Sequence, residues 1–175
     1  MTKLAFLTLI LGLVSSFGIH AQTASAWTDH ARVLPDKLRQ VPVGLTLWHS
    51  PNPCYPEPNP DQAGGYVWKH STQVRSEVGE LEMLECGSFI WYNEQGWQAN
   101  ITQTPAEFAE LFACPQGYLQ PGSTYTFARN YRYADNARSL YGGDALWYIL
   151  AKDKAGTLYK GFGLIETEST VKTNR

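Results

Sequence analysis

The chain has 175 residues, of which 43% are hydrophobic, and 14 Lys and Arg stand against 16 Asp and Glu. This length is enough for one domain with a sizeable core. A mildly acidic chain lacks the positively charged surface that nucleic-acid binders use, so the composition excludes a nucleic-acid partner.

The first 21 residues have the three-part layout of a secretory signal peptide. Lys3 precedes an apolar run from Leu4 to Val14, and small and polar residues follow it. Cleavage after Ala21, or alternatively after Ala26, fits the preference for small residues. A membrane-spanning helix needs about 20 apolar residues, more than this run supplies. We therefore predict a periplasmic or secreted protein with no membrane span.

Two alternating segments in the first half of the chain predict strands, at residues 41–49 and 66–75. His49 lies on the apolar side of the first strand and His70 on the apolar side of the second. Half of the ten prolines lie between positions 51 and 60. They predict a stiff, extended loop over residues 50–65 with no strand pairing of its own.

The alternation changes phase within residues 81–92, which predicts a β-bulge or a bend near Met83 to Glu85. Leu81 shares one side of the strand with Met83, whereas Cys86 lies on the other side by simple alternation.

One short helix is predicted near residues 105–113. Thr104 is placed as the N-cap, Pro105 as the first helical residue, and Glu107 three residues after the cap. This is the capping-box arrangement, in which side chains satisfy the open backbone N–H groups of the first turn.

The last third of the chain predicts a hairpin whose first strand spans residues 145–153. This strand is apolar on both sides, as expected of a central strand covered on both faces. In the returning strand, Gly161 and Gly163 leave a bare patch on one side. A neighbouring aromatic such as Trp147 or Tyr148, or a ligand, would fill it.

Residues 119–125 resemble the tyrosine corner of fibronectin type III and immunoglobulin-like sandwiches. Leu119, Pro121, Gly122 and Tyr125 match the form L-x-P-G-x-x-Y. The resemblance implies that the tyrosine hydroxyl bonds back to the backbone upstream and braces the crossing between two sheets.

These patterns together predict a mainly β protein. We expect an antiparallel, Greek-key, immunoglobulin-like β-sandwich with one short α-helix, formed by residues 27–168. A flexible tail over residues 169–175 would follow this single domain. Such a fold implies no activity by itself.

Three cysteines bear on redox state and cannot all pair within one chain: Cys54, Cys86 and Cys114. Because export permits disulfides, we predict one intramolecular disulfide and one unpaired cysteine. Spacing does not decide the pairing, although Cys54 is favoured because a bridge would pin its loop.

Metal binding is the alternative function, as a periplasmic copper- or zinc-handling protein with His49 and Cys54 as ligands. No H-x-H, C-x-x-C or HExxH spacing supports it. If residues 41–49 and 66–75 paired through the proline-rich loop, His49 and His70 would lie about 13 Å apart, too far to share an ion.

Catalytic motifs are also missing, so we predict a protein that is not an enzyme and needs no cofactor. The sequence has no G-x-S-x-G nucleophile elbow. Glu80 and Glu82 have the spacing of a paired-carboxylate site, but Leu81 points to the opposite side. The two acids therefore fit the solvated side of a strand.

The segment at residues 128–143 concentrates arginine and tyrosine in an otherwise acidic chain. These side chains combine contact area with directional hydrogen bonds and dominate interface energetics. We predict a non-catalytic binding module whose partner is an acidic or hydroxyl-rich protein (as for an inhibitor, immunity or accessory factor) or a glycan. The expected contact residues are Arg129, Tyr131, Arg132, Tyr133, Arg138 and Tyr141.

Overall fold

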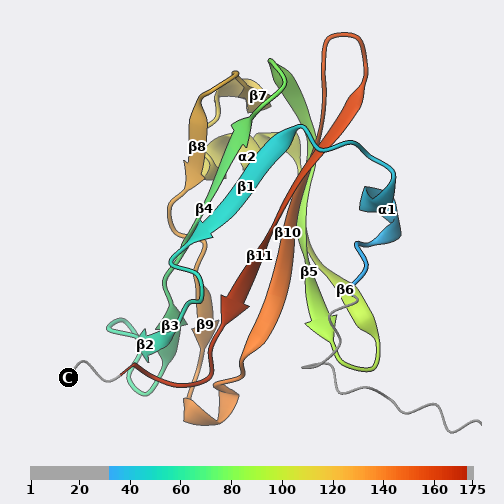
Figure 1. Cartoon of the computed structure of the whole chain (residues 1–175). Helices are drawn as coiled ribbons and strands as arrows, with labels where there is room; N and C mark the ends of the chain where they lie inside the picture. The colour runs from blue at the N-terminus through green and yellow to red at the C-terminus, as the bar shows by residue number, and fades with distance from the viewer. Residues whose placement is uncertain (1–31, 173–175) are drawn as a thin grey trace, which may run out of the picture.

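Strands dominate the protein and form an antiparallel β-sandwich with a third, small sheet at one end (Figure 1). The structure is a computed structural model that describes residues 32–172. The predicted signal peptide and the last three residues of the predicted tail lie outside this range. The prediction of a mainly β, antiparallel sandwich is confirmed.

The larger sheet has the order β11-β10-β5-β6, and β7 adds to β5. Its strands are β5 (Leu81–Tyr92), β6 (Gly96–Gln103), β7 (Tyr118–Leu119), β10 (Gly143–Lys152) and β11 (Leu158–Thr167). The second sheet joins β1 (Leu45–Ser50), β4 (Ser71–Ser76) and β8 (Thr124–Phe127). The third joins β2 (Pro56–Pro58), β3 (Tyr66–Trp68) and β9 (Arg132–Ala134).

Four short helical segments connect or cover the sheets. They are α1 (Asp36–Arg39), α2 (Pro105–Leu111) and the 3-10 turns η1 (Pro115–Gly117) and η2 (Ala137–Ser139). The predicted capping box of α2 is present, with the Thr104 side chain accepting from the Glu107 N–H. Helix α1 was not predicted, because four residues are too few to show a helical period. In the part of the chain that the structure describes, no helix has the length and apolar character needed to cross a membrane.

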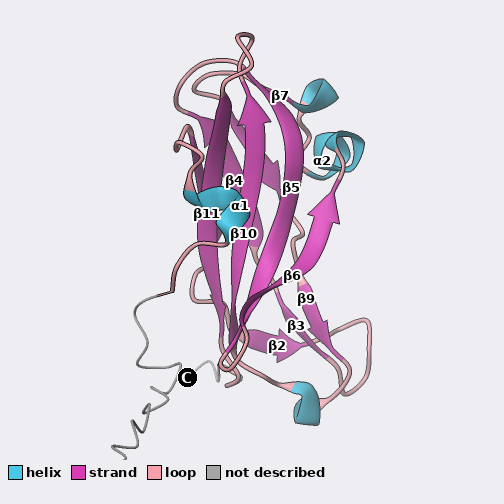
Figure 2. Cartoon of the chain, turned by 90° about the vertical axis from the view of Figure 1, so that its right-hand side faces the viewer, coloured by secondary structure: helices cyan, strands magenta, loops and turns pink. Residues whose placement is uncertain are grey.

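Strand β10 is covered on both faces, as its double-sided apolar pattern predicts. Trp147 and Ile149 face the main core between the two large sheets, whereas Leu146 and Tyr148 pack with Leu38 of α1 on the outer face. Figure 2 shows α1 lying across that outer face.

The predicted bulge in β5 is confirmed. Leu150 of β10 pairs with Glu85, but the next residue of β10, Ala151, pairs with Met83, so Leu84 is the extra residue. As a result, both Met83 and Cys86 are buried in the main core.

The predicted single strand over residues 66–75 is instead two strands in different sheets, β3 and β4. The chain leaves one sheet at Lys69 and enters the next after His70, and alternation alone does not reveal such a break. Strand β1 pairs with β4 and not with β3, so His49 lies opposite Thr72. The ring centroids of His49 and His70 are therefore 5.9 Å apart, and the expected separation was wrong.

The proline-rich segment also differs from its prediction, because it has a strand pairing of its own. Pro56–Pro58 forms β2 and pairs antiparallel with β3. Asn52 further ties the segment to β11, since its side chain donates to the Leu164 carbonyl at 2.8 Å and accepts from the Glu166 N–H at 3.0 Å.

The bare patch at Gly161 and Gly163 is filled by strand β1, and not by Trp147, Tyr148 or a ligand. A Cβ atom on Gly161 would lie 2.7 Å from Leu45 Cβ, and one on Gly163 would lie 2.6 Å from the Leu47 carbonyl oxygen. Both distances are shorter than van der Waals contact. The two glycines therefore let the second sheet rest directly on β11.

We predict that Gly163→Ala destabilises the protein by about 1–3 kcal/mol, the usual cost of overpacking a tight contact. The control is Gly143→Ala, because a Cβ atom there meets nothing within 4 Å. Urea unfolding measures both. Equal stabilities of the two variants would contradict the close contact between β1 and β11.

The tyrosine hydroxyl at position 125 bonds back to the backbone, as the resemblance implies. The Gln120 N–H donates to Tyr125 Oη at 3.1 Å. Gln120 is exposed, so this hydrogen bond braces a surface turn.

The predicted disulfide is absent, which corrects that expectation. All three cysteines are free and buried. The Cys54 thiol donates to the Lys69 carbonyl and the Cys114 thiol to the Tyr118 carbonyl, while Cys86 lies in the middle of β5. Burial raises the pKa of Cys114 to about 11 and also raises the pKa of Cys54. Buried thiols of this kind form the reactive thiolate poorly.

Thiol titration of the denatured, unreduced protein should therefore find three free thiols per chain. The physical reason is that each sulfur has its own buried environment and none is bonded to another. A count of one thiol would mean that two of the cysteines pair in the native protein.

Candidate functional site

A cleft of about 560 Å³ lies at one end of the sandwich. Figure 1 shows that β3 and β9 of the third sheet lie at this end. One wall is the inner face of the larger sheet, where Ser88 of β5 pairs with Trp147 of β10 and alternation places Tyr92 on the same face further along β5. The other wall contains His70 and residues 130–132, which lead into β9. The volume of the cleft lies within the range typical of small-ligand sites.

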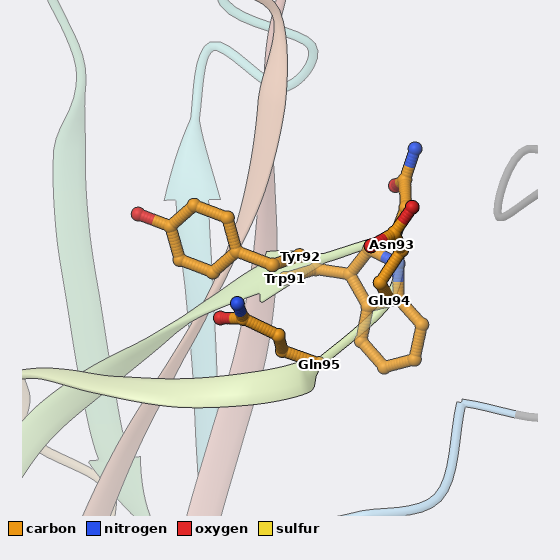
Figure 3. Close-up of a pocket in the computed structure, with 5 residues that line it drawn as sticks. All are labelled: Trp91, Tyr92, Asn93, Glu94 and Gln95. Carbon is orange, nitrogen blue, oxygen red and sulfur yellow. The ribbon is translucent and has the colours of Figure 1, made fainter.

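Three tyrosines line this cleft. They are Tyr92 at the end of β5, Tyr131 before β9 and Tyr141 before β10. Figure 3 shows Tyr92 and Trp91 leaving the β5–β6 hairpin in opposite directions, as expected of consecutive strand residues. The hairpin residues 91–95 also border a shallower hollow of about 390 Å³.

A buried hydrogen-bonded chain fixes the wall opposite the larger sheet. The Asn130 amide donates to Thr72 Oγ1 at 2.7 Å, and Thr72 Oγ1 lies 2.9 Å from His49 Nδ1. His49 Nε2 lies 3.3 Å from the Gly163 carbonyl, which only accepts, so Nε2 carries the proton. Thr72 then donates to Nδ1. A neutral His49 thus links Asn130, a cleft residue, to the strand β11.

His70 lines the cleft but is only 6% exposed. Neither of its ring nitrogens has a hydrogen-bond partner among the described residues. Burial lowers the pKa of His70, and the Trp68 backbone has a smaller effect that raises it. The ring is therefore neutral and polar at the edge of the cavity.

Arg132 is the half-buried cation of the cleft. Its guanidinium lies 4.5 Å from the centroid of the Trp68 ring and donates to Thr167 Oγ1 at 2.6 Å. Burial lowers its pKa, and the nearby Tyr92 acts in the opposite sense. Within residues 32–172, no carboxylate forms a salt bridge with it.

The carboxylate that lines the cleft, Asp144, is already paired. It forms an ion pair with Arg32, whose guanidinium also lies 4.8 Å from the centroid of the Trp91 ring. Because this pair is neutral overall, Arg132 supplies the uncompensated charge of the cavity.

The structure brings together three of the six predicted contact residues. Tyr131, Arg132 and Tyr141 line the cleft. The other three lie outside it: Arg129 is exposed, Arg138 is exposed in η2, and Tyr133 is 61% exposed on β9.

Sequence reasoning missed several residues of the cleft, above all His70, Tyr92 and Asn130. The alternation of β5 places Tyr92 on the core side, which was an available signal. No local pattern indicates that the end of β5 meets residues 130–132, because these segments are brought together by the sheet topology.

His49 and Cys54 do not form a metal site in the described residues. Both ring nitrogens of His49 take part in the buried chain, and the Cys54 thiol donates to a carbonyl. No cluster of three or more His, Cys, Asp or Glu side chains lies within residues 32–172.

Glu80 and Glu82 have ordinary surface contacts. Glu80 pairs with Lys154 and Glu82 with Lys152. Hydrogen bonds from Gln120 and Lys154 lower the pKa of Glu80. A general acid needs a raised pKa, so this pair does not have the character of a glycosidase site.

No protein-family model matches the chain, and no curated protein matches it at a significant level. Among solved structures, the chain is similar to the crystal structure of the ApaA protein from Bordetella pertussis. The identity is 13% and the TM-score 0.42, over 69% of this chain and 88% of that chain. At this level the similarity carries no argument about fold or activity.

We predict that stability falls on acidification through the pH range from 6.5 to about 4. Burial, with a smaller effect of His70, lowers the pKa of His49 to about 4 from its usual 6.5. Between these values the unfolded chain binds a proton that the folded protein does not, so acid favours unfolding. His49 alone would account for about 3 kcal/mol.

Urea unfolding at a series of pH values measures this effect, with His49→Gln as the comparison. The variant should be less stable at pH 7 but should lose less stability between pH 6.5 and 4. Parallel pH profiles for both proteins would show that His49 does not cause the acid sensitivity.

Proposed function

We propose that the protein is an exported, non-catalytic binding module that holds a carbohydrate in the cleft. The observation that carries this proposal is the combination of aromatic side chains and buried polar groups in one cavity. We also infer a Greek-key, immunoglobulin-like arrangement, supported by the hydrogen bond of Tyr125.

The chemistry of the walls suits a sugar ring. Tyrosine rings offer flat apolar surface to the C–H face of a sugar, with a polar tip beside it. Ser88, Asn100 and Asn130 add hydroxyl and amide groups that can donate to and accept from sugar hydroxyls. A mixed lining with a few placed polar groups is typical of specific small-ligand sites.

A protein partner is the second candidate, favoured by an exposed aromatic side chain next to the cleft. Tyr133 of β9 does not line the cleft and is 61% exposed. Exposed tyrosines with adjacent arginines such as Arg138 are typical of protein contact surfaces. On this second hypothesis, the protein partner binds to the outer side of β9.

Two neighbouring tyrosines give a matched test. Tyr131 and Tyr133 lie two residues apart, with ring centroids 6.4 Å from each other, but Tyr131 lines the cleft and Tyr133 does not. Binding of a panel of soluble neutral and acidic oligosaccharides is measured by calorimetry and by tryptophan fluorescence, since Trp147 lines the cavity.

Tyr131→Ala should weaken oligosaccharide binding about tenfold or more, in line with the usual cost of losing an aromatic anchor. Tyr133→Ala should bind as the wild type does. If no oligosaccharide of the panel binds, the carbohydrate proposal fails. Binding of a protein that Tyr133→Ala abolishes and Tyr131→Ala spares would favour the second candidate.

A further inference from the structure

We propose that the cleft contains an anionic subsite at Arg132, and that the bound sugar carries a carboxylate, as a uronic acid does. This inference rests on the proposed function and specifies its substrate class. It depends on three features of Arg132: its place in the cleft, its unused donors and its lack of a counter-charge.

The guanidinium is fixed in place before any ligand arrives. It stacks on Trp68, which is fully buried, and donates to Thr167 Oγ1. Thr167 in turn donates to the Gly143 carbonyl at 2.9 Å, which ties the arginine to the rim of the cleft. A group held by packing on one side and a hydrogen bond on another loses little entropy on binding a ligand.

Most donors of Arg132 are unused. A guanidinium has five N–H groups, and the hydrogen bond to Thr167 is the one that Arg132 makes within the described residues. The planar fork matches a carboxylate with two parallel hydrogen bonds. Thr167, Tyr92 and Arg132 all line the same cavity, and in the proposed complex the free edge of the guanidinium faces it.

The charge balance of the cavity favours a negative ligand. Asp144 is neutralised by Arg32, and burial keeps the His70 ring neutral. Arg132 is partly desolvated, which costs free energy, and no protein carboxylate among residues 32–172 offsets the cost. A carboxylate in the cleft would supply the missing counter-charge.

The test uses matched pairs of oligosaccharides, each a uronic acid oligomer and its own methyl ester. The pairs are galacturonic, glucuronic and mannuronic acid trimers, and inorganic phosphate serves as a free anion. Wild type should bind at least one acid form about tenfold tighter than its ester, since charge-assisted bonds are lost in the ester. The preference should shrink as salt is raised.

Arg132→Gln should bind the acid and ester forms with equal affinity, because the positive charge that distinguishes them is gone. Arg132→Lys should keep a reduced preference, because an ammonium group does not form the paired bonds. Arg129→Gln is the matched control, an exposed arginine of the same segment outside the cleft, and should behave as wild type. Melting temperatures of all variants establish that they are folded.

Three results would overturn the proposal. Equal binding of acid and ester by the wild type in every pair would reject the anionic subsite and leave carbohydrate binding intact. Phosphate that binds as tightly as the best acid would point to a free anion and not a sugar. Failure of every oligosaccharide to bind would reject the proposed function itself.

Discussion

The contact between β1 and β11 is the constraint on which the rest of the molecule depends. Two glycines, Gly161 and Gly163, let Leu45 and Leu47 of the second sheet approach the backbone of the first. This approach places His49 within hydrogen-bonding distance of the Gly163 carbonyl. Side-chain hydrogen bonds link His49 to Thr72 and Thr72 to Asn130, so the contact between β1 and β11 also positions one wall of the cleft.

The tightly packed core and the cleft lie toward different ends of the same interior. Near the two glycines the sheets are close and their side chains form the main core. Toward the third sheet the interior becomes the cleft, where polar groups such as Asn130 and Arg132 join the apolar and aromatic lining. The end of β11 organises this region, since Thr167 accepts from Arg132 and the Glu168 carbonyl accepts from the Trp68 ring N–H at 2.7 Å. Arg132 and Thr167 therefore lie on hydrogen-bonded strand ends.

The sequence predicted local features well because each has a local physical cause. The capping box at Thr104, the bulge next to Met83 and the double-sided strand β10 depend on neighbours along the chain. Features set by topology were missed. The break at His70 and the filling of the glycine patch depend on which strand pairs with which, and alternation carries no such information. The predicted disulfide was wrong. Export permits disulfides in general, but the positions of the individual cysteines in the fold decide whether two of them can bond.

The same reasoning explains why half of the contact residues predicted for the Arg/Tyr segment lie in the cleft. Composition marked this segment as unusual, but the pairing of β9 with β3, which sets Arg132 opposite the buried Trp68, is not visible in composition. Nuclear magnetic resonance of ¹⁵N-labelled protein titrated with a uronic acid trimer tests the central claim most directly. The account predicts shifts of the backbone amides at residues 88–92, 130–132 and 142–145, with residues 153–157 unchanged. Shifts confined to the β10–β11 turn or to the outer face under α1 would contradict it.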